Sequence, residues 1–139
     1  MSTRLVTFTL DDRCYGVDVD TVQEVLRGLP TTRIPLAPHT LAGLINLRGQ
    51  VLVAIDLREQ LGLEQRSTDV DPMLVVLRMA GESMALLVDS IGAVVDVDND
   101  QFEPPPDTLT GPSRALVRGA YKLPDRLLLA LDVDRAVAA

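Results

Sequence analysis

Apolar side chains fall on every second position from Val6 to Leu10 and again from Tyr15 to Val19, with polar or small residues between them. This period of two is typical of β-strands that bury one face. The intervening Asp11-Asp12-Arg13 supplies turn-forming residues. Unbroken apolar runs also occur at Val51–Ile55 and Leu127–Leu131, and their five-residue length suits buried strands. The pattern predicts a mainly β chain.

The chain resembles itself when it is shifted by 69 residues. Leu5–Leu26 then falls on Leu74–Val95 without a gap. With one added residue, Arg48-Gly49 falls on Arg118-Gly119, and after a six-residue insertion Leu52–Gln60 falls on Leu128–Ala136. Such self-similarity indicates two copies of one small fold.

We therefore predict two tandem, pseudo-symmetric, five-stranded β-barrels with one or two short helices, in a single domain spanning residues 1–139. The first barrel is expected at about residues 5–66 and the second at about residues 73–137, because the polar segment 64–72 lies at the junction of the repeat. Exchange of strands between the two halves stays open at this point. Asp56–Leu61 has the residues of a short helix, and the proline-rich Phe102–Pro112 predicts an extended surface loop.

Composition narrows the class of protein. Apolar residues form 47% of the 139-residue chain, enough for a packed core, and only 3% are aromatic. Thirteen basic and 20 acidic side chains give a net charge of −7, which argues against nucleic acid and against an anionic membrane surface as partners. The N-terminus does not resemble a secretory signal, and no apolar run approaches the roughly 20 residues that cross a bilayer. We expect a cytoplasmic protein that does not insert into the membrane.

Candidate chemistry is sparse. His39 is the only histidine and Cys14 the only cysteine, so no internal disulfide is possible and no zinc ligand set is present. We interpret His39 as a loop residue and Cys14 as a small apolar residue of a strand. Asp20-Thr21 and Asp89-Ser90 suggest the paired aspartates of an aspartic protease, but bulky Val22 and Ile91 follow where such enzymes need glycine. We predict no enzymatic activity, no cofactor and no metal.

One stretch has an unusual residue. Gly43–Arg58, GLINLRGQVLVAIDLR, joins two apolar runs through a segment that contains Arg48. Tight hairpins favour Asn-Gly or Asp-Gly, so a long cation there points to a role beyond forming the turn. Held between two rigid strands, a guanidinium offers a planar set of donors that suits carboxylates or carbonyl groups of a partner. The alternative is an internal clamp in which Arg48 bonds Glu24 or Asp56.

Four ordered blocks of the sequence resemble the CheW family, the coupling proteins of bacterial chemosensory systems. The blocks are Phe8–Leu26, Gly43–Arg58, Leu86–Val97 and Val117–Val137, of which Gly43–Arg58 is the most specific. The resemblance implies two SH3-like barrels and a non-enzymatic adaptor. Such an adaptor holds the regulatory domain of the histidine kinase CheA against the cytoplasmic tips of methyl-accepting chemotaxis receptors. A scaffold of a non-flagellar pathway, for pilus motility or gene regulation, is the alternative.

By motif matching, the resemblance places Val22, Glu24, Gly43, Asn46 and Arg48 in or near the receptor-binding surface. We see no receiver-domain extension and no kinase core in the sequence, and we expect a free-standing coupling protein. For Arg118, which repeats the Arg-Gly pair, we expect a barrel-closing turn. The family commonly has proline at the position of Val53, and valine there restores a backbone donor.

Overall fold

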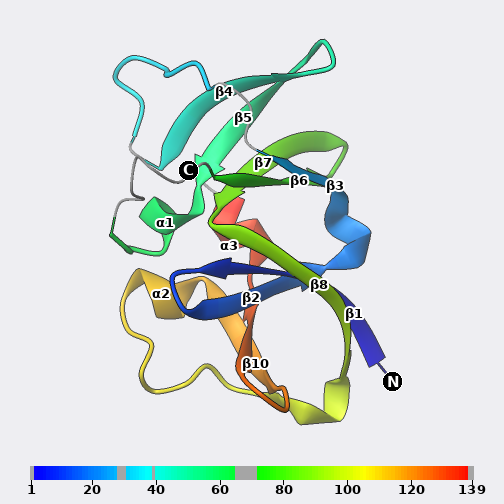
Figure 1. Ribbon diagram of the computed structural model, residues 1–139. Helices are drawn as coiled ribbons and strands as arrows, with labels where there is room; N and C mark the ends of the chain where they lie inside the picture. The colour runs from blue at the N-terminus through cyan, green and yellow to red at the C-terminus, as the bar shows by residue number, and fades with distance from the viewer. Residues whose placement is uncertain (1, 28–30, 39, 65–71, 138–139) are drawn as a thin grey trace.

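The chain folds into two mixed β-sheets of six and five strands (Figure 1). The computed structural model describes residues 2–27, 31–38, 40–64 and 72–137. The mainly β fold class is confirmed, and the described residues contain three short α-helices. The elements are β1 Ser2–Leu10, β2 Arg13–Asp18, η1 Val19–Thr21, β3 Val22–Arg27, β4 Leu41–Leu47, β5 Gln50–Asp56, α1 Leu57–Gln60, β6 Met73–Met79, β7 Glu82–Val88, β8 Ser90–Asp98, η2 Asn99–Gln101, β9 Phe102–Glu103, α2 Pro112–Ala115, β10 Val117–Lys122, β11 Leu127–Leu131 and α3 Val133–Val137.

Each sheet contains strands from both copies of the sequence repeat. The five-stranded sheet has the order β3-β6-β7-β5-β4, and the six-stranded sheet has the order β8-β1-β2-β11-β10-β9. The β1–β2 hairpin therefore lies in one sheet, while its counterpart β6–β7 lies in the other. In Figure 1 the five-stranded sheet forms the upper half of the molecule and the six-stranded sheet the lower half. The chain crosses between the sheets after β2 and again after β7. The division into subdomains at residues 66 and 73 remains a prediction.

Three hydrophobic clusters fill the fold. The largest lies between the sheets and contains side chains from both, among them Phe8, Tyr15, Leu77 and Leu129. A second cluster belongs to the five-stranded sheet and a third to the six-stranded sheet. Strands such as β6 and β11 lie between two clusters and bury both faces, which explains their unbroken apolar runs. Cys14 is buried in the third cluster, as its apolar interpretation predicted.

Over their second halves, the two copies of the repeat align differently in the structure from the alignment that the sequence indicated. Residues 41–61 match residues 117–137 at one constant shift of 76, without an insertion. Both hairpins shift register at the same place, between Leu41 and Gly43 in β4 and between Val117 and Gly119 in β10. Arg118 consequently lies within strand β10, and the expectation that it forms a turn is wrong. The position that matches Arg48 is occupied by Pro124.

The short helix after β5 begins where the sequence predicted. The Asp56 carboxylate caps α1 by accepting a hydrogen bond from the Arg58 backbone N–H at 3.1 Å. Asp132 has the matching place before α3, and the Gln60 side chain donates to the Ala136 carbonyl at 2.6 Å, which ties α1 to α3. The proline-rich segment is mostly loop, but its first two residues form β9 and Leu109 is buried in the central cluster. His39 lies outside the described residues.

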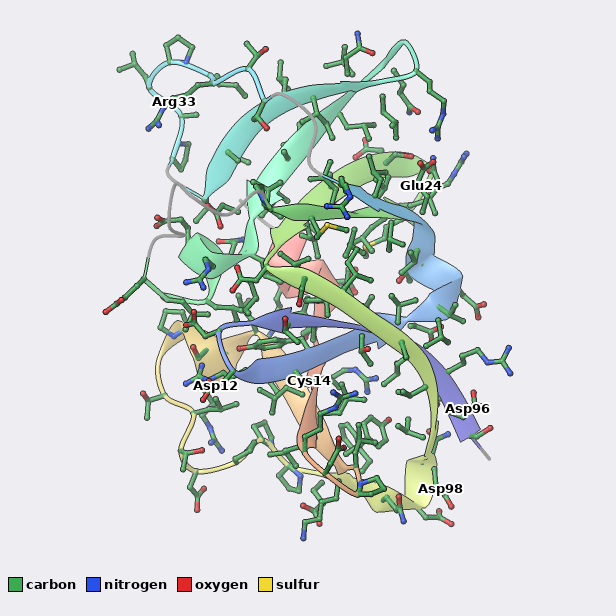
Figure 2. All side chains as sticks on the ribbon, in the orientation of Figure 1. Asp12, Cys14, Glu24, Arg33, Asp96 and Asp98 are labelled. Carbon is green, nitrogen blue, oxygen red and sulfur yellow. The ribbon has the colours of Figure 1, made fainter. Side chains whose placement is uncertain are left out.

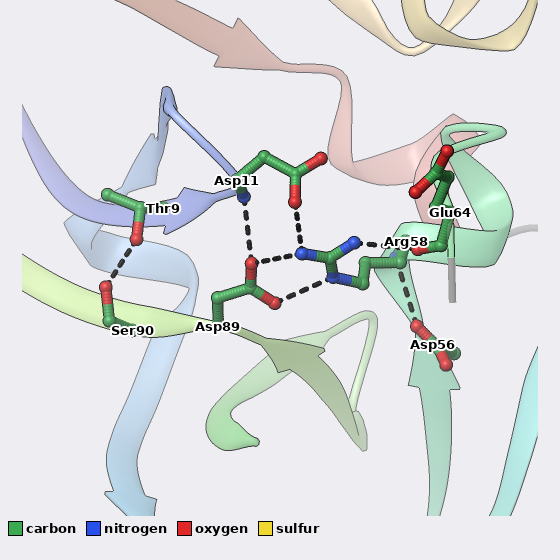
Figure 3. A network of polar contacts seen from close by, with 7 residues as sticks. All are labelled: Thr9, Asp11, Asp56, Arg58, Glu64, Asp89 and Ser90. Atoms are coloured by element: carbon green, nitrogen blue, oxygen red, sulfur yellow. Dashed lines mark hydrogen bonds and ion pairs between the residues drawn. The ribbon is translucent and has the colours of Figure 1, made fainter. Parts of the chain in front are cut away.

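Arg58 lies at the centre of a polar network between the two sheets (Figure 3). Its guanidinium donates to both carboxylate oxygens of Asp89, with Nε–Oδ1 and Nη2–Oδ2 distances of 2.9 and 2.6 Å. It also pairs with the Asp11 carboxylate, and Nη1 donates to the Glu64 carbonyl at 2.7 Å. The Asp11 backbone N–H donates to Asp89 at 2.8 Å. The hydrogen bond with Asp89 raises the pKa of Arg58 further above its ordinary value, against the opposing effect of burial.

This network joins segments that are distant in sequence. Arg58 comes from α1, Asp11 from the β1–β2 turn, and Asp89 is the single residue at which the chain passes from β7 in one sheet to β8 in the other. The Arg58 side chain is only 10% exposed, so its donors need these acceptors. The buried guanidinium is paired with carboxylates from the β1–β2 turn and from the crossover. It therefore fixes the position of the crossover relative to both sheets.

We predict that Arg58→Ala lowers the free energy of unfolding by about 3 kcal/mol, because it removes the guanidinium opposite the largely buried Asp89 carboxylate. The measurement is urea denaturation followed by circular dichroism. Arg78→Ala serves as the matched control, since Arg78 is exposed on β6 and its loss is expected to change stability by less than about 0.5 kcal/mol. Equal stability of the two variants would show that the network contributes nothing to the fold.

Candidate functional site

The turn that contains Arg48 is tighter than the sequence indicated. Leu47 pairs with Gln50, so Arg48 and Gly49 alone connect β4 to β5. Both have positive φ, 52° for Arg48 and 87° for Gly49, as a two-residue type I′ hairpin requires. The Asn46 side chain accepts a hydrogen bond from the Gly49 N–H at 2.9 Å. An arginine therefore occupies a left-handed position that favours Asn, Asp or Gly, and this backbone strain indicates a role for its side chain.

The Arg48 guanidinium pairs with the Glu24 carboxylate. Glu24 lies on β3 and Arg48 follows β4, and these strands are the two opposite edges of the five-stranded sheet. The sheet therefore curves until its edges approach each other at this ion pair. Figure 2 shows Glu24 at the right-hand side of the upper half of the molecule. The Arg48 side chain is 68% exposed and that of Glu24 is 27% exposed.

The pair confirms the clamp contact but limits its value for stability. An ion pair with such an exposed partner contributes at most about 1 kcal/mol, because water screens it and the long side chain loses freedom. The other predicted partner, Asp56, caps α1 instead. The exposed remainder of the guanidinium is available to a second acceptor, so the clamp and a binding role are compatible.

The structure brings only part of the predicted receptor surface together. Arg48, Glu24 and Asn46 lie at one end of the five-stranded sheet. Val22 is half-buried and packs against the central hydrophobic cluster, so it supports β3 from within. Gly43 is buried beneath the bridge between Thr32 and Leu44, where a Cβ atom would lie 2.2 Å from the Thr32 carbonyl oxygen. Gly43 thus shapes the site indirectly, by letting the backbone at Thr32 pair closely alongside β4.

Outward-facing valines were missed at the sequence level. Val51 and Val53 are 60% and 38% exposed on β5, and Val25 is 43% exposed on β3. The run Val51–Ile55 is continuously apolar, which predicted burial on both faces and hid the outward positions. The sequence feature that could have identified Val51 as an outward-facing residue is its position close to the Arg48 turn. Val53 pairs with Leu44 on one side and Met84 on the other, so β5 is an interior strand.

No catalytic arrangement is present in the described parts of the chain. The Asp89 carboxylate is held by Arg58, so it is not one half of a proton-sharing aspartate pair with Asp20. The described residues contain no group of three or more histidine, cysteine or acidic side chains placed to hold a metal. None of the helices in the described residues is long and apolar enough to cross a membrane. The fold and the site define a β-sheet module that presents an exposed, ion-paired guanidinium at one end of its five-stranded sheet.

The comparisons with known proteins agree. The model of the CheW-like domain matches residues 4–139. The chain is 28% identical over 130 residues to a chemotaxis protein CheW of Rhizobium meliloti, covering 94% of this chain and 84% of the relative. It is 28% identical over 132 residues to a chemotaxis protein CheW of Klebsiella aerogenes, covering 95% and 80%. The crystal structure of the scaffolding protein TtCheW from Thermoanaerobacter tengcongensis superposes with a TM-score of 0.85 at 30% identity, covering 100% of this chain and 90% of that one.

The chain belongs to the family of CheW-like domains. It is a non-enzymatic chemotaxis adaptor that couples receptors to the kinase CheA. The resemblance drawn from the four sequence blocks is thereby confirmed.

We predict that Gly43→Ala lowers the free energy of unfolding by about 2–4 kcal/mol, because the methyl group meets the Thr32 carbonyl and φ is 144°. The measurement is urea denaturation. Gly49→Ala is the control: φ is also positive there, but no atom lies within 4 Å of the added Cβ, so only the backbone cost of about 1 kcal/mol is expected. If both variants lose the same stability, close approach at Gly43 is not the reason for its glycine.

Proposed function

We propose that Arg48, Glu24 and Asn46 form the receptor-facing surface of this adaptor, with Val22 and Gly43 supporting it from beneath. The observation that carries the proposal is the strained, two-residue turn that holds an exposed guanidinium. A short turn between paired strands has little freedom, so the arginine is ordered before its partner arrives. A carboxylate or a carbonyl group at the cytoplasmic tip of a methyl-accepting receptor suits this donor.

Glu24 acts in this proposal as the orienting partner of Arg48. The ion pair with Glu24 directs the Arg48 guanidinium along the end of the sheet. The negative charge of Glu24 also reduces the attraction of this surface for unrelated anions. The Asn46 side chain fixes the backbone of the same turn through its hydrogen bond to Gly49. Removal of any of the three is expected to change the direction or the charge of the donor, with little effect on the core.

The second partner in the proposal is the regulatory domain of the CheA-type kinase, which the family resemblance describes as having the same fold. Packing of one sheet end on another needs an outward apolar surface. Val51 and Val53 supply such a surface on β5, the strand that leads away from the Arg48 turn. The proposed site of action is the cytoplasm, at the membrane-bound receptor arrays.

We predict that Arg48→Ala weakens binding to a receptor cytoplasmic fragment by about tenfold, as loss of a charged hydrogen bond would. Co-sedimentation with nanodisc-embedded receptor measures this. The thermal midpoint is expected to move by less than about 3 °C, because the ion pair contributes little to stability. Arg78→Ala is the matched control and retains receptor binding. Unfolding of Arg48→Ala, with a large drop in the midpoint, would assign the arginine to the clamp alone.

We also predict that Val51→Ser weakens binding to the kinase regulatory domain by about five- to tenfold, because the exposed methyl groups of Val51 are lost from an apolar contact. Isothermal titration calorimetry measures the kinase affinity. Val94→Ser is the control, since Val94 is 53% exposed on β8 in the other sheet. Unchanged kinase affinity in Val51→Ser, or equal losses in both variants, would place the kinase contact elsewhere.

A further inference from the structure

A shallow hollow on the six-stranded sheet is lined by three arginines. Arg114 comes from α2, Arg118 from β10 and Arg135 from α3, and all three are exposed. The hollow has a volume of about 550 Å³, and Asp132 is its only acidic lining residue. It lies on elements that contribute nothing to the Arg48 surface.

Each arginine is held by a contact that leaves other donors free to bind. Arg114 donates to the Pro106 carbonyl at 2.9 Å. Arg135 donates to the Ala115 carbonyl at 3.3 Å, and its Nε lies 3.6 Å from Asp132. The guanidinium carbon of Arg118 lies 5.3 Å from the centre of the Phe102 ring. A guanidinium has five N–H donors, so one such contact orders the group without using it up.

The charge of this region is opposite to that of the rest of the chain. Residues 112–139 contain five basic and three acidic side chains, whereas residues 1–111 contain eight basic and 17 acidic ones. Another hollow, at the N-terminal strand, is lined by Arg4 and by three aspartates including Asp96. Figure 2 shows Asp96 and Asp98 at the side of the molecule opposite to α2. The three arginines are thus a local positive site on an acidic protein.

We propose that this hollow binds an acidic peptide segment of a protein partner, at a surface separate from the Arg48 site. Carboxylates spaced along a peptide match guanidinium groups that come from three different elements. The occupant is a peptide rather than a polyanionic surface, because the net charge of −7 repels nucleic acid and anionic lipid outside the hollow, and Asp132 opposes dense phosphate within it. Binding is expected to weaken with salt, since the site is open to solvent.

The test is a titration of the ¹⁵N-labelled full chain with a short synthetic peptide of alternating Glu and Ser, followed by amide chemical shifts. We expect saturable shifts confined to residues 103–118 and 132–137. The Arg114→Gln/Arg118→Gln variant is expected to bind about five- to tenfold more weakly. The control, Arg27→Gln/Arg78→Gln, removes the same charge from exposed positions of the five-stranded sheet and retains the affinity.

Equal weakening in both double variants would overturn the proposal, because net charge alone would then account for binding. Shifts outside the hollow would overturn it too. Titrations with inorganic phosphate and with vesicles that contain phosphatidylserine distinguish other anions: the same saturable shifts at equal strength would assign the site to small anions or to lipid. If the glutamine variant does not fold, Arg114→Lys/Arg118→Lys keeps the charge and loses the planar donors, and weaker peptide binding by this variant is the expected result.

Discussion

The pairing of Arg58 with Asp89 and Asp11 is the constraint on which the arrangement of the two sheets depends. Because the β1–β2 and β6–β7 hairpins each join the sheet built mainly by the other half of the chain, the two crossovers decide how the sheets meet. Asp89 is one of these crossovers, and a guanidinium holds it from α1. The central hydrophobic cluster supplies most of the burial between the sheets, but apolar packing has little direction, whereas the bidentate pair permits one geometry.

At the matching positions, the other copy of the repeat keeps the backbone shape of the turn but not the ion-paired side chains of the Arg58 network. The positions that match Arg58 and Asp89 are Asp134 and Asp20, two acids, and the position that matches Asp11 is Ala80. Asp11 and Ala80 both have positive φ, 56° and 51°, so the two turns have the same backbone shape. The backbone of the duplicated unit is thus retained while its side chains have diverged. The same divergence gives one hairpin Arg48-Gly49 and the other Pro124-Asp125, so the two halves present different surfaces to partners.

The sequence predicted much of the fold and less of the site. Alternation and the repeat predicted the strands, and Asp56 predicted the start of α1, because these signals are local. The expectation for Arg118 was wrong because the two Arg-Gly pairs were aligned with each other, which concealed the longer alignment without gaps. The extra residues of the second copy lie before β10, so Arg118 falls within this strand. The Arg58 network could not be predicted, since it forms only when a crossover, a turn and a helix from three parts of the chain meet. The burial of Gly43 depends in the same way on the distant Thr32.

We propose that the end of the five-stranded sheet, around the Arg48 turn, receives the receptor. The most direct measurement is hydrogen–deuterium exchange of the chain with and without a receptor cytoplasmic fragment. We expect added protection at β3 and at the β4–β5 turn, with unchanged exchange at β10 and β11. Protection centred on the six-stranded sheet, with the Arg48 turn exchanging as it does in the free protein, would show that the receptor binds elsewhere.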